Sequence, residues 1–377
     1  MNIIVAPDSF KGSISAQAAA QAMKQGILDA VPKAHVLELP LADGGEGTME
    51  NLVTATGGRI THKQVTGPLG NPVKAGYGIL GDGKTCVIEI AQASGLPLIR
   101  PVDRNPEIAS TEGTGELIRH ALDDGLREFI IGLGGSATND GGTGMLRALG
   151  MKFLDVQGKP VKAGGGDLNR LAEIDASEFD QRIQACRFLI ASDVDNPLIG
   201  LNGASHVFGP QKGAAKDVAS RLDDNLRHYA DAVEKLTGTV LHDYPGAGAA
   251  GGAGGAFLAF FPTQIRRGID VVLEASGFLE HVKDCDMVLT GEGKSDLQTL
   301  SGKTPFGVAE VSAQFDKPVL LISGIIAEDS RDALEEHFTE VHAVVGPSVS
   351  QKQSFLDPEK YLRKKTKQVV AAYLKTQ

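Results

Sequence analysis

Two charged residues in the first loop of this chain have the types and the spacing that phosphate chemistry needs. Asp8 and Lys11 lie in PDSFKGS at 7–13, which joins a predicted strand end to a predicted helix start. Such a loop offers a carboxylate, an ammonium and free backbone N–H groups to a phosphate and its metal ion. Taken alone, the loop could equally be a capped turn in which Asp8 and Lys11 form an exposed ion pair.

A second acidic loop, ADGGEGT at 42–48, follows the next predicted strand. Its acids, Asp43 and Glu46, are separated by glycines, which allow the chain to bend tightly around a metal ion or a substrate hydroxyl. A later strand ends in GEGKSD at 291–296, where Glu292 supplies a further acid. We therefore expect these acids to line a binding site.

A pair of aspartates follows a predicted strand in the middle of the chain. SDVDNPL at 192–198 places Asp193 and Asp195 at alternate positions. Alternate acids after a strand can share a hard cation such as Mg²⁺ through their oxygen atoms. A plain Asx turn before Pro197 is the alternative interpretation.

The glycine-rich segment GLGGSATNDGGTG at 132–144 is the strongest single signal of function. It follows a predicted strand and precedes a predicted helix, and its spacing is not that of a Walker A loop. Glycines let the backbone approach a phosphate, while hydroxyl groups add donors near a helix N-terminus. A purely structural turn is the alternative. The candidate binding residues of this segment are Gly134, Gly135, Ser136, Thr138, Asn139 and Asp140.

Composition and charge narrow the classes of function. The formal net charge of -10 disfavours nucleic acids and anionic membranes as partners. Histidines do not cluster, and the sequence has neither a zinc-hydrolase motif nor a G-x-S-x-G elbow. The three cysteines are far apart, which predicts buried thiols in a reducing compartment. Without a signal peptide or a long apolar run, we expect a cytoplasmic protein.

The elements that must position these loops alternate between strands and helices at both chain ends, beginning with a helix capped by Ser15. Such alternation predicts βαβ units and a parallel sheet that binds ligands beyond the carboxyl ends of its strands. The middle of the chain differs, with hairpin signals and long glycine-rich loops. We predict an α/β protein with one domain from 1–60 plus 286–377, a second α/β domain inserted at 61–285, and the active site in the cleft between them.

Six motifs, taken together and in this order along the chain, resemble the type I glycerate kinase family, which includes bacterial glycerate 2-kinases. The resemblance runs nearly from end to end of the chain, and six ordered motifs make a chance similarity implausible. The motifs are PDSFKGS at 7–13, ADGGEGT at 42–48, GTGELI at 113–118, GGSATNDGG at 134–142, SDVDNPL at 192–198 and TGEG at 290–293.

The resemblance implies a flavodoxin-like (Rossmann-like) domain carrying an inserted domain, and ATP-dependent phosphorylation of D-glycerate with Mg²⁺. Bacterial members similar to this chain are expected to phosphorylate the 2-hydroxyl, giving 2-phospho-D-glycerate in glycolate, glyoxylate or galactarate breakdown. The partners are then two small substrates, and the chain acts as a monomer or a homodimer. The alternatives are phosphorylation of the 3-hydroxyl, a metal-dependent phosphatase, and a non-catalytic protein that binds a small acid or a nucleotide.

Roles for the site residues are hypotheses that follow from what phosphoryl transfer needs, namely positioning and charge stabilisation. Residues 134–138 would cradle a phosphate. Lys11 would neutralise the transferring group or the substrate carboxylate. Asp193 would act as the base or, with Asp195, as a metal ligand, and Asp8 joins Lys11 and Asp193 among the catalytic residues. The residues that would complete the binding site are Asp43, Glu46, Asn139, Asp140 and Glu292.

Overall fold

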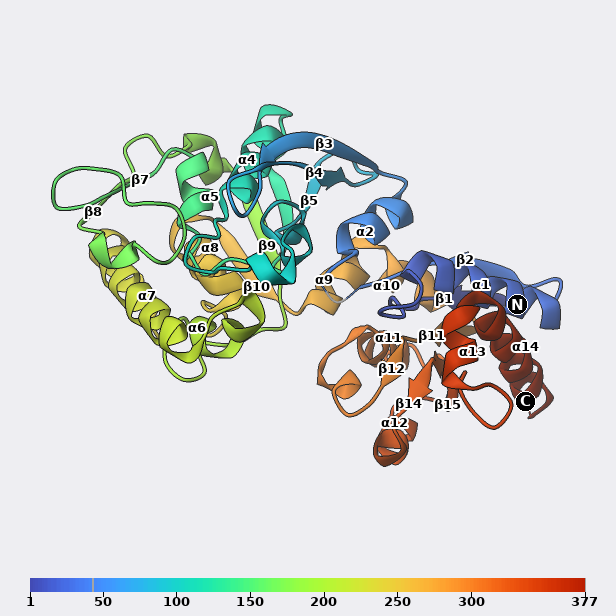
Figure 1. Ribbon diagram of the computed structural model, residues 1–377. Coiled ribbons are helices and arrows are strands. Elements are labelled where there is room, and N and C mark those ends of the chain that lie inside the picture. The colour runs from blue at the N-terminus through green and yellow to red at the C-terminus, as the bar shows by residue number, and fades with distance from the viewer. Residues whose placement is uncertain (43, 377) are drawn as a thin grey trace. The chain divides into compact units, whose positions relative to one another are not determined.

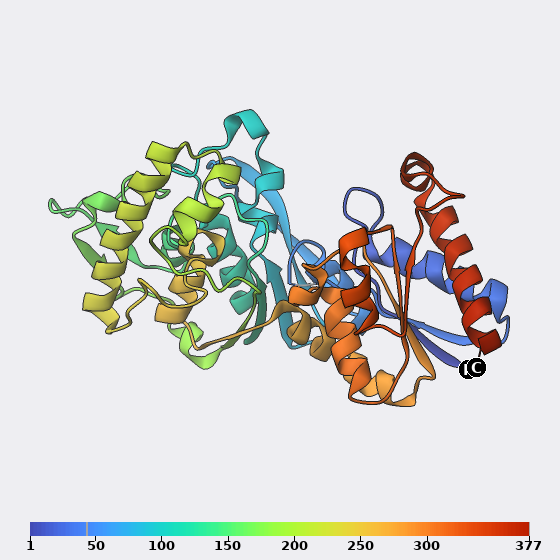
Figure 2. The same cartoon turned by 90° about the horizontal axis from the view of Figure 1, so that it is seen from below.

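The computed structural model describes residues 1–42 and 44–376, which form two compact units (Figure 1 and Figure 2). Unit 1 contains the described residues within Met1–Asp43, Glu50–Thr56 and Arg267–Gln377, and therefore combines both chain ends. Unit 2 contains the residues of Gly44–Met49 and Gly57–Arg266. Both units mix helices with parallel strands, so the predicted α/β class is confirmed.

The boundary between the two units differs from the predicted one at the point where the chain returns from unit 2 to unit 1, which is Arg267. Residues 267–285 were predicted to belong to the inserted domain, whereas the structure groups this segment with the chain ends. Helix α9 (Gly268–Ala275) packs there against helix α11 (Thr304–Ala313). A Cβ atom built on Gly307 would lie only 2.4 Å from Cγ1 of Ile269, so the two helices approach each other closely within unit 1.

Unit 1 is built on a five-stranded parallel sheet with the strand order β15-β13-β11-β1-β2. Ile3 lies opposite Met287 in the register of β1 and β11, which joins the start of the chain to a segment near its end. In Figure 1 this pairing appears as blue strands beside orange ones. The strands are β1 (Asn2–Val5), β2 (His35–Glu38), β11 (Met287–Thr290), β13 (Val319–Ser323) and β15 (Glu340–Ala343).

Helix α1 (Ala16–Ala30) packs beside the C-terminal helix α14 (Pro358–Thr376), as Figure 2 shows. Its start is set by Ser15, whose Oγ accepts a hydrogen bond from the backbone N–H of Ala18 at 3.2 Å. Apolar residues at helical spacing, among them Met23 and Ile27, are buried in the same core as strand β1. The predicted Ser15-capped helix is therefore confirmed.

The order of the strands in unit 1 produces a natural place for a ligand. Strand β1 connects to β2 on one side of it, whereas β11, β13 and β15 extend the sheet on the other side. The connections that leave β1 and β11 therefore diverge at the carboxyl edge of the sheet. Open α/β sheets bind their ligands in the crevice formed at such a point.

Unit 2 is built on a six-stranded sheet with the order β10-β9-β6-β5-β4-β3. Strands β3 and β4 form an antiparallel hairpin, and the other neighbours run parallel except at the β4–β5 pair. Phe129 and Phe188 stack across neighbouring strands with ring centroids 4.6 Å apart in a large apolar core. The strands are β3 (Arg59–Thr66), β4 (Pro72–Ile79), β5 (Thr85–Glu89), β6 (Glu128–Gly132), β9 (Arg187–Ala191) and β10 (Thr263–Arg266).

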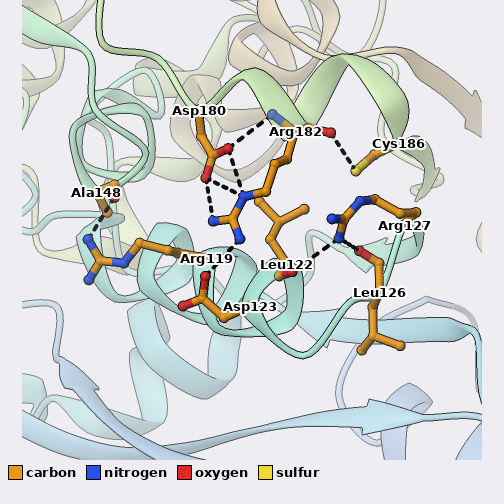
Figure 3. Close-up of polar contacts among 9 residues, drawn as sticks. All are labelled: Arg119, Leu122, Asp123, Leu126, Arg127, Ala148, Asp180, Arg182 and Cys186. Carbon is orange, nitrogen blue, oxygen red and sulfur yellow. Dashed lines mark hydrogen bonds and ion pairs between the residues drawn. The ribbon is translucent and has the colours of Figure 1, made fainter.

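Polar contacts around Arg182 tie the turn before β9 to helix α4 (Glu112–Asp123), as Figure 3 shows. The guanidinium donates to Asp180 from Nε at 3.0 Å and from Nη2 at 2.7 Å, and to Asp123 Oδ1 from Nη1 at 2.8 Å. The Sγ of Cys186 donates to the carbonyl of Arg182 at 3.2 Å. Because Arg182 and Asp123 are partly exposed, these ion pairs contribute little to the stability of the unit.

The remaining elements are shorter or lie around the two sheets. Strands β7 (Lys152–Leu154) and β8 (Glu173–Asp175) form a separate antiparallel pair, and β12 (Lys294–Ser295) pairs in parallel with β14 (Ile325–Ile326). The remaining α-helices are α2 (Thr48–Thr56), α3 (Ala91–Ser94), α5 (Thr143–Ala148), α6 (Ala204–Phe208), α7 (Lys216–Thr237), α8 (Ala253–Phe260), α10 (Phe278–His281), α12 (Arg331–Glu335) and α13 (Gln351–Leu356).

Two simpler expectations can be compared with the structure. Cys86, Cys186 and Cys285 are buried free thiols, as predicted. Burial raises the pKa of each thiol, so none is an activated nucleophile. Within residues 1–42 and 44–376, no helix has both the length and the apolar character needed to cross a bilayer.

Candidate functional site

Asp8 lies directly beyond the end of β1, at the crevice of unit 1, and its side chain is 6% exposed. Its Oδ1 accepts from the backbone N–H of Ser9 at 2.5 Å, and its Oδ2 accepts from Oγ1 of Thr304 at 2.8 Å. The backbone N–H of Asp8 donates to the carbonyl of Gly291 at 2.9 Å. The loops after β1 and β11 are therefore fixed to each other, and the carboxylate is held in one orientation.

Glu292 is the matching acid beyond the end of β11. Its Oε1 accepts from Oγ of Ser295 at 3.0 Å and from Oγ1 of Thr299 at 2.7 Å. The residue is 8% exposed. Burial raises the pKa of Glu292, and the two hydroxyl donors oppose that rise only in part. A carboxyl whose pKa moves toward neutrality is suited to accept a proton during catalysis.

A cavity of about 370 Å³ opens at this edge of unit 1 and is lined by both acids. Lys294 and Lys303 approach Asp296 to 3.3 and 4.0 Å, so a carboxylate holds these two ammonium groups at the cavity. Two of the predicted catalytic residues, Asp8 and Lys11, thus share one cavity with Glu292. The charged residues that line it are Asp8, Lys11, Glu292, Lys294, Asp296 and Lys303.

The glycine-rich loop after β6 lies in unit 2, and only its first part is accessible. Gly134 and Gly135 are exposed, while Ser136 is buried. Asn139 is fully buried, and its amide donates to Oγ of Ser205 at 3.2 Å. The predicted phosphate cradle therefore has an open glycine segment and a closed end.

Asp140 accepts several of the hydrogen bonds that fix the buried end of the glycine-rich loop. Its fully buried carboxylate accepts from both the backbone N–H and Oγ1 of Thr111, at 2.8 and 2.9 Å, and from the backbone N–H groups of Gly142 and Gly144 at 3.1 and 3.2 Å. Burial raises the pKa of Asp140, while these donors lower it. In this arrangement Asp140 organises the starts of helices α4 and α5, which the sequence analysis did not foresee.

Lys212 is a residue that the sequence analysis missed. It is 2% exposed, and its Nζ donates to Oγ of Ser136 at 2.9 Å and to the carbonyl of Thr138 at 2.7 Å. Burial lowers the pKa of Lys212 to about 7. The available signal was GPQKG at 209–213, where a lysine lies between turn residues; such a lysine is ordinarily exposed. These two hydrogen bonds fix the position of the glycine-rich loop.

The backbone of Gly251 packs directly against Thr138 of the glycine-rich loop, which leaves no room for a side chain at position 251. A Cβ atom on Gly251 would lie 2.0 Å from the carbonyl oxygen of Thr138, and Gly251 has a φ of +68°. Gly251→Ala is therefore expected to cost at least about 3 kcal/mol of unfolding free energy, from backbone strain and overlap together. Gly238→Ala is the matched control, because Gly238 has a φ of +76° with no atom within 4 Å of the added Cβ.

Urea unfolding of both variants measures how much unfolding free energy each substitution costs. Gly238→Ala isolates the cost of a left-handed backbone, about 1 kcal/mol, so the excess loss in Gly251→Ala reports the packing beneath Thr138. Equal losses in the two variants would contradict the close contact.

Three other acids predicted for the site are more exposed than Asp8 and Glu292. Asp193 and Asp195 follow β9 in unit 2, and Glu46 lies on the loop that precedes helix α2; all three are exposed. Asp43 lies outside the described residues. Among the residues that are described, no group of three or more His, Cys, Asp or Glu side chains is arranged to hold a metal ion. The roles of Asp193, Asp195 and Glu46, and the placement of the active site in a cleft, stay predictions.

Comparison with known proteins gives matches that cover nearly the whole chain. The family model described as "Glycerate kinase family" matches residues 3–374. A "Glycerate kinase" of Bacillus subtilis (strain 168) is 49% identical over 99% of this chain and 97% of its own length. A "Glycerate 2-kinase" of Escherichia coli (strain K12) is 49% identical over 87% of this chain and 86% of its own. The crystal structure described as glycerate kinase 2 from Salmonella typhimurium LT2 has 45% sequence identity and a TM-score of 0.90, covering 100% of this chain and 99% of that one.

Proposed function

This chain belongs to the glycerate kinase family, and on that premise we propose that it transfers the γ-phosphoryl group of ATP to the 2-hydroxyl of D-glycerate. The Escherichia coli relative named as a glycerate 2-kinase supports the choice of the 2-hydroxyl. The observation that carries the proposal is the cavity of unit 1, which combines two buried acids with three lysines at the carboxyl edge of a parallel sheet. Acids and lysines are the groups that phosphoryl transfer uses for proton transfer and charge stabilisation.

The two buried acids are suited to act on the attacking hydroxyl. A general base must be held within hydrogen-bond reach of the proton it accepts, and its pKa should lie near the working pH. The carboxylate of Asp8 is held in one orientation at the cavity by Ser9 and Thr304. Burial raises the pKa of Glu292, which moves it in the direction of the working pH. We assign proton acceptance to this pair.

The lysines neutralise charge during transfer. Lys11 is exposed on the loop after β1, where its ammonium can contact the transferring group or the substrate carboxylate. Phosphoryl transfer depends chiefly on such preorganised positive charge around the phosphate oxygens. Both units carry residues assigned to the reaction, since the glycine-rich loop held by Lys212 belongs to unit 2.

The chain's acids fit a Mg²⁺ that is bound together with ATP. Mg²⁺ in kinases is usually held by one or two carboxylates and by the substrate's own phosphates, so it does not need a cage of protein ligands. Asp193 and Asp195, both exposed beyond the end of β9, would hold the ion as such a pair. When bound, the ion neutralises the charge on the phosphate oxygens.

A coupled assay of ADP release with ATP, Mg²⁺ and D-glycerate tests the function. We expect ADP formation that depends on D-glycerate, and a product whose phosphorus NMR spectrum is that of 2-phosphoglycerate. A 3-phosphoglycerate product would keep the kinase and correct the hydroxyl. Folded protein that releases no glycerate-dependent ADP would contradict the proposal.

The assignment of Asp193 can be tested separately. Asp193→Ala is expected to lower kcat by more than about tenfold, because it removes one of the two carboxylates assigned to Mg²⁺. Asp217→Ala is the matched control, since Asp217 is an exposed aspartate of the same unit that pairs with Arg221 on the surface of α7. Steady-state kinetics and circular dichroism give the two readouts. Near-normal turnover in a folded Asp193→Ala protein would remove Asp193 from the site.

A further inference from the structure

The cavity of unit 1 has a charged part and an apolar part, which come from different elements. The charged residues belong to the loops after β1 and β11 and to the start of α11. Apart from Phe10 on the loop after β1, the apolar residues belong to the segments after β13 and β15 and to helices α13 and α14. Because the strand order is β15-β13-β11-β1, the two parts lie toward opposite ends of the carboxyl edge. The apolar lining residues are Phe10, which is itself buried, and Ile325, Val344, Val345, Phe355, Pro358 and Leu362.

The dimensions of this cavity exceed what a three-carbon acid needs. Strands β1 and β15 are three strand spacings apart, or about 14 Å. The volume of about 370 Å³ lies in the range of pockets that enclose ligands much larger than glycerate. Glycerate carries a polar group on every carbon, so it would gain nothing from the apolar wall. A ligand with a charged end and a flat apolar end would use both parts.

Phe355 gives the apolar part a specific feature. It lies on helix α13 at the wall of the cavity, and 51% of it is exposed. Large aromatic side chains are usually buried, and one whose face is open can stack on another planar ring. The neighbouring Leu356 is 75% exposed and does not line the cavity. The exposure of Phe355 therefore coincides with a place where a ligand ring can lie.

We propose that this cavity is the nucleotide site, with the purine base of a nucleoside triphosphate against Phe355 and the phosphates among Lys11, Lys294 and Lys303. The inference rests on the proposed function, because the chain needs a site for a nucleoside triphosphate only if it is a kinase. Asp296 keeps two of these lysines at the cavity in the absence of phosphate. This assignment places the nucleotide phosphates in unit 1, whereas the sequence analysis expected a phosphate cradle at 134–138.

Calorimetric titration of the full chain with the non-hydrolysable analogue AMP-PNP and Mg²⁺, without glycerate, tests the site. Phe355→Ala is expected to raise the Kd for AMP-PNP at least about fivefold, because the base loses its stacking partner. Leu356→Ala is the matched control and should leave the Kd unchanged. Ser354→Trp, which places a large side chain into the cavity from a partly exposed position, should abolish binding.

Inorganic tripolyphosphate separates the base from the phosphates. Because it has no base, its affinity should be the same in Phe355→Ala as in the wild type. Lys294→Gln removes a phosphate contact, so it should weaken both tripolyphosphate and AMP-PNP. A loss of tripolyphosphate binding in Phe355→Ala would show that Phe355 acts through the fold of the cavity, and would overturn the assignment of the base.

Steady-state kinetics distinguish failure of this inference from failure of the proposed function. Phe355→Ala should raise KM for ATP and leave KM for glycerate unchanged. If Phe355→Ala and Ser354→Trp keep the wild-type KM for ATP while glycerate is phosphorylated, the inference is wrong and the function stands. If AMP-PNP binds as expected but no glycerate-dependent ADP forms, the inference stands and the proposed function is wrong.

Discussion

Asp8→Asn is expected to lower kcat by at least about a hundredfold, because it removes a buried carboxylate assigned to proton acceptance. The variant should fold. Asparagine keeps an oxygen that accepts from the Ser9 N–H, and the Thr304 hydroxyl can rotate to accept from the new amide. The loss should therefore appear in turnover and not in the melting temperature. Steady-state kinetics and thermal unfolding of the same preparation measure both.

Asp286→Asn is the matched control for Asp8→Asn. Asp286 immediately precedes β11, at the opposite edge of the same sheet, and its Oδ2 accepts from the backbone N–H of Asn2 at 2.7 Å. Ligands bind at the carboxyl edge of such a sheet, so the control should turn over normally. A folded Asp8→Asn enzyme with wild-type kcat, or an equal loss of kcat in Asp286→Asn, would contradict the catalytic role assigned to Asp8.

Lys212→Met is expected to lower kcat by about ten- to a hundredfold through the glycine-rich loop. The ammonium ties Ser136 and Thr138, and methionine fills a similar volume without any donor. Lys212 is a positioning residue, so its loss should change kcat and KM for glycerate and leave the affinity for AMP-PNP unchanged. Lys216→Met is the control, because Lys216 is an exposed lysine at the start of α7.

The pH dependence of stability gives Lys212 a readout that does not depend on activity. Its pKa is lowered from 10.5 to about 7 in the folded chain. Between these two values the unfolded chain binds more protons than the folded chain, so the contribution of Lys212 to the free energy of unfolding rises with pH. The stability of the wild type relative to Lys212→Met should therefore increase from about pH 7 toward pH 10.5. A difference that is flat with pH would contradict the burial of a titrating ammonium.

Local sequence patterns predicted the elements and the loops that carry charge. Alternating strands and helices indicated a parallel sheet, and Ser15 marked the start of the first helix. The acids were correctly placed beyond strand ends, since Asp8 follows β1 and Glu292 follows β11. These features depend on residues close together in the sequence, such as caps, turn residues and apolar periodicity. Six ordered motifs also sufficed to indicate the family, which the comparisons confirm.

Burial could not be predicted in the same way for the glycine-rich loop. Asn139 and Asp140 were expected to bind a ligand, and their residue types are compatible with that role. The structure buries both and uses Asp140 to hold the starts of two helices. Lys212 was missed for the complementary reason, because a lysine in a turn is ordinarily exposed.

The sequence by itself determined which residues have the chemistry for phosphoryl transfer and that they follow strands of an α/β protein. Only the tertiary structure decided which of them share a cavity. Asp8 and Glu292 are 284 residues apart in the chain, and they meet because β1 pairs with β11. The order of parallel strands is set by crossover connections and by packing between distant segments. Local periodicity carries no information about that order, so the cavity could be seen only once the sheet was assembled.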